Sequence, residues 1–385
     1  MPNLILITMR FIHLSDLHLG KRISSLPMLE EQRAFLFDQL IPIIKDQEPD
    51  GILIAGDIFD KATPSAEALS LFDDFLVAVT RLPKRPEVFA ISGNHDSAEQ
   101  IAYGSRILDR SGLHMSPVYD GSVTPFTMKD EFGELDVYML PFVRKATIRY
   151  CFPDAVIQTE NEAIAVAVGE MNVDPLRRSI CIAHQFVSGS SVSGAEETNI
   201  GGLDCVGADV FSGFDYVALG HIHKPQSITP YIRYSGSPLK YSLAEVGHIK
   251  SVTIVDIHEK GDVTISEIPV IPVNDWFDLR GTFDEITSPS YLVQHPEYAE
   301  GYVRITLTDE YDVIEGYRVL KSLFPHMVDF RYDNTRTRTL GAISGTQATV
   351  MTDEEFIRRL FSLQNGREMD NEEYQFIKTI LECDR

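Results

Sequence analysis

The chain has 385 residues, of which 44% are hydrophobic and 24% are charged, so its composition is that of an ordinary globular protein of two to three domains. Its 34 basic and 57 acidic residues give a formal net charge of −23, which by itself argues against a nucleic-acid partner, because duplex DNA attracts basic surfaces. No apolar stretch approaches the roughly 20 residues that span a bilayer, and four cysteines without a C-x-x-C pair predict free thiols, so we expect a cytoplasmic location and no membrane contact.

Apolar runs and helical patterns alternate in the first two thirds of the chain. We expect strands at 10–14, 51–56, 88–92, 137–142, 179–184, 216–221 and 251–257, and helices at 29–47, 64–81, 98–111 and 160–172. The runs GILIAG and VFAIS are apolar throughout, which is typical of strands buried on both faces. This alternation predicts an α/β domain in which sheets are layered with helices.

The pattern changes at about residue 272. Residues 272–340 contain one expected helix near 310–323 and β-like runs such as YVRITLT, which predicts a small α+β domain. Residues 341–352 include the run GAISGTQAT, which has the composition of a linker. Residues 353–385 predict two short amphipathic helices broken around Gly366. We therefore expect one domain over 9–271, a second over 272–340, a linker and a helical tail.

Five segments place polar side chains directly after an apolar run. They are FIHLSDLHLG (11–20), GILIAGDIFD (51–60), VFAISGNHDS (88–97), SICIAHQFV (179–187) and DYVALGHIHKPQ (215–226). Ligands bind at the carboxyl ends of strands in open α/β sheets. We therefore expect the following side chains to meet at one site: Asp16, His18, Asp57, Asn94, His95, His184, His221 and His223.

These residue types are ligands of divalent first-row metals. Carboxylate, imidazole and amide groups suit such ions, and the lack of cysteine ligands argues against a structural zinc site. Two ions roughly 4 Å apart can activate a water molecule and neutralise a phosphoryl group. Asp57 is the natural bridge, because one carboxylate can reach both ions. Gly56, Gly93 and Gly220 precede proposed ligands and allow a sharp turn or a close approach of the backbone.

Each motif alone has an ordinary alternative interpretation. A D-x-H or a G-D pair is common in turns, and two alternating histidines can simply be exposed. Five such segments in this order are together hard to produce by chance. His13 alternates into the first strand, and we interpret it as structural. The histidines outside every motif are interpreted as surface or packing residues: His114, His248, His258, His295 and His326.

The ordered set D-x-H, G-D, G-N-H-D, H and G-H-x-H resembles the calcineurin-like metallophosphoesterases. Longer runs are similar to the members of that family that serve as nuclease subunits with an ATPase in bacterial DNA repair: HLSDLHLG, LPFVR, AHQFV with a later IGG, HKPQ and YSGSPLKYS. The match covers nearly the whole chain from Met9 onward. It implies a four-layer sandwich of two mixed sheets flanked by helices, a small α+β capping domain that binds DNA, and C-terminal helices that dock on the ATPase.

The resemblance also implies a role for each site residue. One metal ion would have four ligands: Asp16, His18, Asp57 and His223. The second would share the bridging ligand and add three more: Asp57, Asn94, His184 and His221. His95 would be the acid or transition-state group near the leaving oxygen, and Asp96 would be a supporting catalytic residue that orients it. The family's usual activator is Mn²⁺. Asp60 departs from the archaeal and eukaryotic relatives, which carry a histidine there.

We therefore expect a manganese-dependent DNA nuclease that acts with an ATPase, as a homodimer, in repair, recombination and replication. The resemblance implies 3′–5′ exonuclease activity on duplex ends and endonuclease activity on hairpins and single strands. The metal ions add positive charge where phosphate sits, and the ATPase would supply much of the DNA-binding surface. One alternative is a phosphoesterase of the same fold acting on a small molecule or a phosphoprotein, which needs no docking helices. Another is a binding scaffold with a dead site, which would have lost ligands.

Overall fold

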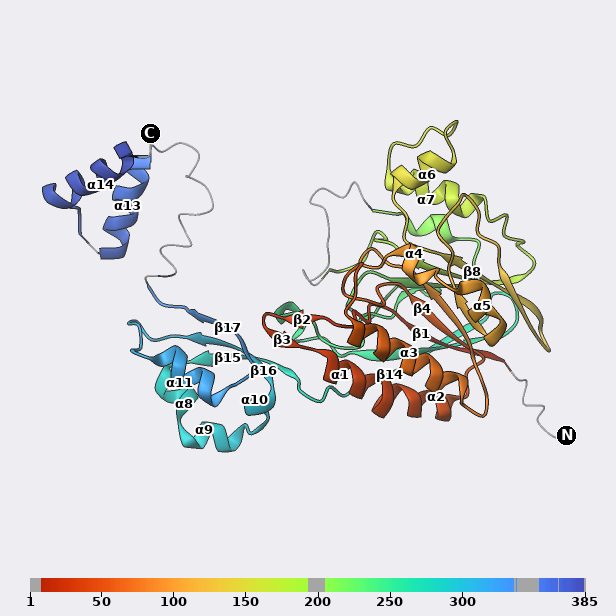
Figure 1. The fold of residues 1–385 in the computed structure, drawn as a ribbon, viewed down its shortest axis with the longest axis horizontal. Helices are drawn as coiled ribbons and strands as arrows, with labels where there is room; N and C mark the ends of the chain where they lie inside the picture. The colour runs from red at the N-terminus through yellow and green to blue at the C-terminus, as the bar shows by residue number, and fades with distance from the viewer. Residues whose placement is uncertain (1–7, 193–204, 336, 338–352, 366, 384–385) are drawn as a thin grey trace. The chain divides into compact units, whose positions relative to one another are not determined.

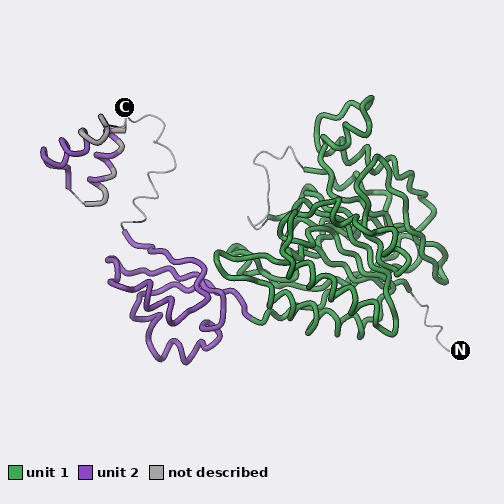
Figure 2. Tube along the Cα trace, viewed as in Figure 1, with its two compact units in different colours: residues 1–273 green, residues 274–385 purple. Residues whose placement is uncertain are grey.

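The computed structural model describes residues 8–192, 205–335, 337, 353–365 and 367–383. The chain divides into two compact units, residues 1–273 and 274–385 (Figure 2). The expected linker over 341–352 and the IGG run lie outside the described residues. None of the described helices is long and apolar enough to span a membrane. Cys151, Cys181 and Cys205 are free thiols, as the sequence predicts.

Two six-stranded mixed sheets build the first unit (Figure 1). The first sheet has the order β14-β13-β1-β4-β5-β6, and its strands are β1 (Met9–Leu14), β4 (Gly51–Ala55), β5 (Glu87–Ile91), β6 (Leu113–Met115), β13 (Ser251–Ile257) and β14 (Val263–Pro269). The second has the order β11-β12-β10-β9-β8-β7, and its strands are β7 (Phe126–Asp130), β8 (Gly133–Leu140), β9 (Arg178–His184), β10 (Tyr216–Gly220), β11 (Gln226–Thr229) and β12 (Ile232–Tyr234).

The central strands of both sheets run parallel, and the antiparallel strands lie toward the edges. β1, β4, β5 and β6 are parallel to one another, as are β8, β9, β10 and β12. Fully buried side chains from both sheets form one apolar layer, which includes Phe11, Leu53, Phe89, Val137 and Ile180. This layer holds the sheets face to face and aligns the carboxyl ends of their central strands, where the motif segments begin.

Helices cover the outer sides of the sheets. Figure 1 shows α1 (Leu29–Ala34), α2 (Ile41–Gln47) and α3 (Ala66–Thr80) on one side of the unit, and α6 (Lys145–Cys151) and α7 (Glu160–Gly169) on the other. A π-helical turn over Phe35–Leu40 joins α1 to α2, so the expected helix at 29–47 is continuous. Ser65 caps α3 by accepting a hydrogen bond from Ala68 N. The expected four-layer sandwich is confirmed.

The expected helix at 98–111 is wrong as a single element. It is divided into α4 (Ala98–Ile101), α5 (Ser105–Leu108) and a 3₁₀ turn over Asp109–Ser111. Gly104 has φ +73°, a left-handed conformation that ends the first piece before the second begins. β14 also has no counterpart among the expected strands. Its exposed edge position leaves it with alternating, mostly polar residues rather than an apolar run.

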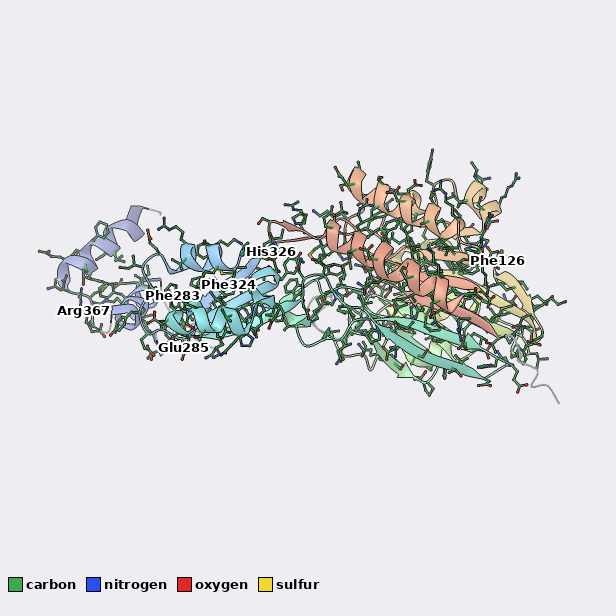
Figure 3. All side chains as sticks on the ribbon, turned by 90° about the horizontal axis from the view of Figure 1, so that it is seen from below. Phe126, Phe283, Glu285, Phe324, His326 and Arg367 are labelled. Carbon is green, nitrogen blue, oxygen red and sulfur yellow. The ribbon has the colours of Figure 1, made fainter. Side chains whose placement is uncertain are left out.

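The second unit begins with a three-stranded parallel sheet of β15 (Trp276–Gly281), β16 (Tyr302–Leu307) and β17 (Met327–Tyr332). Four helices accompany it: α8 (Phe283–Thr287), α9 (Pro289–Gln294), α10 (Glu297–Glu300) and α11 (Gly316–Leu323). The sequence predicted only the last of these. α8 is started by a capping box in which Thr282 and Glu285 satisfy each other's backbone amides, a local signal that a search for periodicity misses. Phe324, labelled in Figure 3, is fully buried between sheet and helices.

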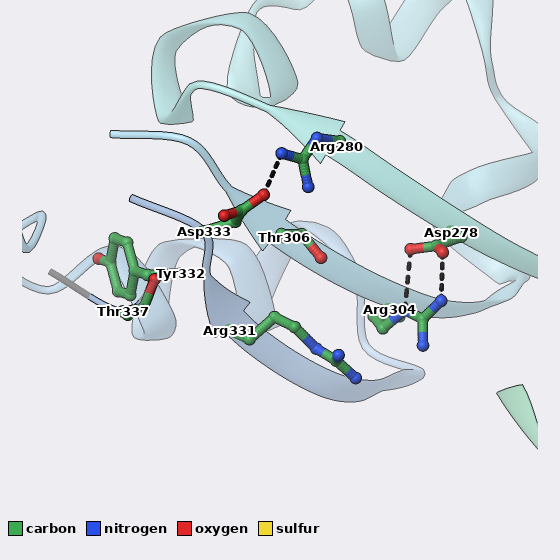
Figure 4. A pocket seen from close by; sticks show the side chains of 8 residues that line it. All are labelled: Asp278, Arg280, Arg304, Thr306, Arg331, Tyr332, Asp333 and Thr337. Atoms are coloured by element: carbon green, nitrogen blue, oxygen red, sulfur yellow. Dashed lines mark hydrogen bonds and ion pairs between the residues drawn. The ribbon is translucent and has the colours of Figure 1, made fainter. Parts of the chain in front are cut away.

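The opposite face of this small sheet is polar. Three arginines from adjacent strands, Arg280, Arg304 and Arg331, line a pocket of about 570 Å³ (Figure 4). They alternate with the core side chains Leu279 and Ile305, which places them on the face away from the helices. Each arginine is paired with a carboxylate: Arg280 with Asp333, Arg304 with Asp278, and Arg331 with Asp329. The charges of this face are therefore balanced within the sheet.

The C-terminal residues form two helices, α13 (Asp353–Asn365) and α14 (Asn371–Cys383), as the sequence predicts. Tyr374 on α14 donates a hydrogen bond to Glu354 on α13, and the Arg358 guanidinium lies 4.3 Å from the centre of the Tyr374 ring. Arg367 stacks on Phe361 at 5.0 Å. These contacts join the helices to each other, whereas Phe376 is 68% exposed.

Candidate metal centre

The predicted site residues follow the carboxyl ends of five strands from both sheets. β1, β4 and β5 are neighbours in the first sheet, and β9 and β10 are neighbours in the second. The loops after these strands approach one another across the inter-sheet layer: Asn94 Oδ1, which follows β5, lies 3.0 Å from Nε2 of His184, the last residue of β9. The structure therefore brings together side chains that are up to 207 positions apart, Asp16 and His223 at the extremes.

A first group of donors contains Asp16, His18 and His223. Their ligand atoms all lie within 4.8 Å of one another, and all three side chains are buried. The Nε2 atoms of His18 and His223 are 3.1 Å apart. Two nitrogens bound to one ion at about 2.0–2.1 Å are separated by about 3 Å, so this spacing fits a shared cation.

A second group contains Asn94, His184 and His221. Asn94 Oδ1 lies 3.0 Å from His184 Nε2 and 3.0 Å from His221 Nδ1. The other ring nitrogen of His184, Nδ1, donates to the Ala55 carbonyl oxygen at 2.8 Å, which leaves Nε2 as the nitrogen with a lone pair toward the site. One amide oxygen and two imidazole nitrogens thus converge on one point.

Asp57 lies between the two groups. Its Oδ2 is 3.7 Å from His18 Nε2 in the first group and 3.3 Å from His184 Nε2 in the second. Its other oxygen, Oδ1, accepts a hydrogen bond from His95 N at 2.9 Å. The backbone contact fixes the carboxylate so that a single oxygen faces both groups. This is the arrangement expected of a ligand that two ions share.

The charges of the site fit divalent cations. Asp16 is fully buried and Asp57 is 2% exposed, and within the described part of the chain neither forms an ion pair with a lysine or arginine. Burial raises the pKa of Asp16. Burial acts in the same sense on Asp57, but His184, His18 and His95 outweigh it, so the pKa of Asp57 lies well below its usual value. Buried carboxylates without a cationic side chain are costly unless they coordinate metal.

The backbone of the site is strained at the donors themselves. Asp16, His18, Asp57 and His221 have positive φ angles of 53°, 45°, 50° and 99°. Non-glycine residues rarely adopt this conformation, and such strain concentrates where a site needs its side chains preorganised. A Cβ on Gly93 would lie 2.1 Å from Asp57 Oδ1, so the expected need for glycine beside the ligands is confirmed.

His95 lies at the edge of the first group. Its ring is 4.9 Å from that of His18 and nearly perpendicular to it. Its Nδ1 donates to the backbone carbonyl oxygen of Asp60 at 3.0 Å, which leaves Nε2 for a substrate. Sequence patterns do not predict this contact, because a carbonyl oxygen has no residue-type signature.

Asp96 differs from expectation in its contacts. We expected it to orient His95, but its carboxylate accepts hydrogen bonds from the backbone of Gly93 at 2.9 Å, Phe59 at 2.9 Å and Ile58 at 3.1 Å. Burial, and then the charge of Asp57, raise the pKa of Asp96 to about 6. Asp96 therefore fastens the loop after β4 to the loop after β5, and the Asp60 carbonyl oxygen is the group that holds the His95 ring.

Basic residues near the centre are partly neutralised. Lys21 pairs with Asp60 at 2.7 Å, and the same Asp60 oxygen lies 3.8 Å from His18 Nδ1. Arg144 is exposed and lies 5.8 Å from the centre of the Phe142 ring. That ring in turn lies 6.1 Å from the ring of His184. Arg144 is thus an exposed cation within one side chain of the second donor group.

Two donor groups that share one buried carboxylate, at the strand ends of a two-sheet sandwich, define a metal-dependent phosphoesterase. The pattern of the calcineurin-like phosphoesterases matches residues 9–225, and the chain belongs to this family.

Two relatives resemble the chain over most of its length. The SbcD component of the SbcCD nuclease from Staphylococcus saprophyticus is 28% identical over 377 residues, which cover 97% of this chain and 98% of the relative. The protein of the same name from Staphylococcus epidermidis is 29% identical over 324 residues, which cover 83% of this chain and 84% of the relative. A solved structure, a purple acid phosphatase from yellow lupin seeds, is 14% identical with a TM-score of 0.41, and the match covers 69% of this chain and about half, 52%, of the phosphatase.

Proposed function

We propose that this chain is the DNA nuclease subunit of an SbcCD-type complex, acting with an SbcC-type ATPase in DNA repair, recombination and replication. The observation that carries the proposal is the position of Asp57 Oδ2, 3.7 Å from one donor group and 3.3 Å from the other. Similarity over nearly the full length to relatives named as the nuclease subunit supports DNA as the substrate and the ATPase as the partner.

The seven donors divide into two sets that share Asp57. We assign one ion to Asp16, His18, Asp57 and His223, and the other to Asp57, Asn94, His184 and His221. Oxygen and imidazole donors without thiolates suit Mn²⁺, which we propose as the activating ion. When bound, two such ions neutralise charge on a phosphodiester and lower the pKa of a bound water. The chain's contribution is to hold the donors at this spacing and to exclude other solvent from them.

His95 is the proposed acid or transition-state group. Because Nδ1 donates to the Asp60 carbonyl oxygen, Nε2 is the ring atom that can deliver a proton to a leaving oxygen or hold it in a hydrogen bond. Asp96 acts through the backbone, by fixing the two loops that carry Asp57 and His95. Cleavage of a phosphodiester then proceeds with the leaving oxygen on the side of His95.

The net charge of −23 constrains how DNA is bound. Lys21 is neutralised by Asp60, so we propose Arg144, beside the second donor group, as a phosphate contact of this chain. The rest of the basic surface would come from the ATPase, and the nuclease subunit would act as a homodimer. The proposed activities are 3′–5′ exonuclease action on duplex ends and endonuclease action on hairpins and single strands.

A panel of substrates tests this proposal. Purified protein is incubated with Mn²⁺ and, in parallel, with linear duplex DNA, circular single-stranded DNA, p-nitrophenyl phosphate esters and a phosphopeptide. We expect Mn²⁺-dependent cleavage of both DNAs, including the circle, which only an endonuclease opens, and loss of cleavage in EDTA. Hydrolysis of the phosphopeptide or of the small esters with both DNAs left intact would contradict the proposal and support a phosphoesterase with a different substrate.

A further inference from the structure

A buried ion pair lies directly behind the first donor group. Glu245 is fully buried and Lys250 is 4% exposed, and the Lys250 ammonium contacts the Glu245 carboxylate. Charged side chains are almost never buried this completely, because both groups lose their hydration, and such a pair often contributes little to stability by itself. Neither residue belongs to a metal-binding motif in the sequence. The reason for burying the pair must therefore lie in what it contacts.

Both oxygens of Glu245 have hydrogen-bond partners. Oε1 accepts from His223 Nδ1 at 3.2 Å and from Ser242 Oγ at 3.3 Å, and Oε2 accepts from Lys250. The Lys250 ammonium uses its three hydrogens on Glu245, on the His223 carbonyl oxygen at 2.8 Å and on Ser237 Oγ at 2.8 Å. An ammonium group has three donors and no acceptor, so this network satisfies it completely.

His223 is consequently held at two points. Glu245 holds its ring through Nδ1, and Lys250 holds its backbone through the carbonyl oxygen. A carboxylate only accepts hydrogen bonds, so the proton of the neutral ring lies on Nδ1 and the lone pair on Nε2. Nε2 is the atom 3.1 Å from His18 Nε2, inside the first donor group. The pair therefore selects the tautomer that can bind metal.

The YSGSPLKYS run supplies the walls of this network. Its Ser237 and Ser242 contact Lys250 and Glu245, and its Tyr241 hydroxyl contacts the Leu17 carbonyl oxygen next to His18. Glu245 ends the short 3₁₀ turn Leu243–Glu245, and Lys250 immediately precedes β13. This segment has no metal ligand of its own, so its contacts with the residues around His18 and His223 give it a role.

We propose that Glu245 and Lys250 are positioning residues that fix the ring and the tautomer of His223 and thereby set the metal affinity of the first donor group. The inference rests on the proposed ligand role of His223, and it concerns metal binding whatever the phosphoester substrate. Losing a hydrogen-bond partner of a metal-binding histidine typically weakens metal affinity by about 10-fold to 100-fold. We expect a change of that size at one of the two sites and little change at the other.

Titration calorimetry of Mn²⁺ into metal-free full-length protein tests the proposal. Removing one partner alone would leave a buried charge unpaired, so the first variant is the double substitution Glu245→Met and Lys250→Met, which keeps the volume apolar. The second variant is Glu245→Gln with Lys250→Met, which restores an oxygen that can accept from His223. The matched control replaces another buried pair in the same way, Asp130→Met with Arg178→Met. Circular dichroism establishes that each variant is folded.

We expect the double methionine variant to bind one Mn²⁺ about 10-fold to 100-fold more weakly than the unaltered protein. The glutamine variant should recover part of that affinity, and the control should bind both ions as the unaltered protein does. The proposal is overturned if the double methionine variant binds both ions with unaltered affinity. It is also overturned if the glutamine variant shows no recovery, or if the control loses as much affinity as the double methionine variant.

Discussion

At the scale of single residues, contacts distinguish the histidines that donate to the metal centre from His95 and from the structural His13. His184 and His223 each donate from Nδ1 to a fixed oxygen and turn Nε2 toward another donor. His95 also donates from Nδ1, to the Asp60 carbonyl oxygen, but its ring lies at the rim of the donor groups and is partly exposed. This difference supports a role for His95 in chemistry rather than in holding metal.

Substituting His95 separates these two roles. We expect His95→Gln to keep both metal ions, because no donor is lost, and to reduce the turnover number by roughly 10²–10⁴, the loss typical of a missing general acid or base. Metal content by mass spectrometry and the rate of DNA cleavage are measured on the same sample. A variant that loses metal together with activity would show that His95 is a ligand.

His13 illustrates a buried histidine with a purely structural role. Its Nε2 donates to the Leu219 carbonyl oxygen at 3.2 Å, and its Nδ1 accepts from the Tyr216 hydroxyl at 2.8 Å, which connects β1 to β10 across the sheets. The interpretation of His13 as structural is confirmed. Burial, assisted by the charge of Arg233, lowers its pKa to about 3. The folded protein therefore keeps His13 neutral at pH values where the unfolded chain protonates it.

The sign of the pH effect follows from this depressed pKa. As pH falls below about 6.5, the unfolded state takes up a proton that the folded state refuses until about pH 3, so the contribution of His13 to stability is lost as pH falls. We expect the stability difference between the unaltered protein and His13→Gln to shrink by roughly 1.5 kcal/mol between pH 6.5 and 5. Urea unfolding at the two pH values measures it, and a constant difference would contradict the assignment.

At the scale of elements, the sequence predicted what strong local patterns encode. The buried strands β4, β5, β9 and β10 are continuous apolar runs, and the donors follow them directly, so both the α/β class and the candidate residues were readable. β14 and α8–α10 were not, because an edge strand alternates with polar residues and helices of four to six residues are too short to show a period.

Long-range contacts account for the rest of what the sequence did not predict. The contact of Asp96 with three backbone amides and that of Glu245 with His223, 22 positions earlier, depend on how separate loops meet in space. Neither contact leaves a spacing or a composition in the chain. The donors could be predicted because chemistry restricts their residue types, whereas the groups that position them can be a carbonyl, an amide or a distant carboxylate.

The C-terminal helices carry a prediction about the partner. Phe376 is 68% exposed on α14, whose neighbours Tyr374 and Arg358 pack between the two helices. An exposed aromatic side chain on an amphipathic helix is a typical anchor for a groove on another protein. We expect Phe376→Asp, or deletion of residues 350–385, to abolish co-purification with the SbcC-type ATPase while Mn²⁺-dependent cleavage of single-stranded DNA persists, because every proposed donor precedes residue 224.

A control on the same helix makes the test specific. Glu372→Gln alters an exposed residue in the first turn of α14 without removing an apolar anchor, so binding to the ATPase should persist. A truncated protein that binds the ATPase at full strength would refute the docking role of the tail and direct attention to the small domain.

At the scale of the whole molecule, a strongly acidic chain carries a centre that attracts anions only when its donors hold cations. The two sheets bring seven donors to one edge, and the buried carboxylates Asp16 and Asp57 make the site electrostatically unfavourable without metal. Metal binding and recognition of a phosphodiester are therefore coupled. The coupling depends most on Asp57, the one residue that belongs to both donor groups.

The most direct test of a two-metal centre is the metal content of Asp57→Asn. An asparagine keeps the size of the side chain but removes the negative charge that two dications would share. After loading with Mn²⁺ and removal of free metal, mass spectrometry should find two ions in each unaltered chain, fewer than two in the variant, and no DNA cleavage by the variant. Two ions retained in Asp57→Asn would contradict the bridging role of Asp57 and, with it, the two-metal centre proposed here.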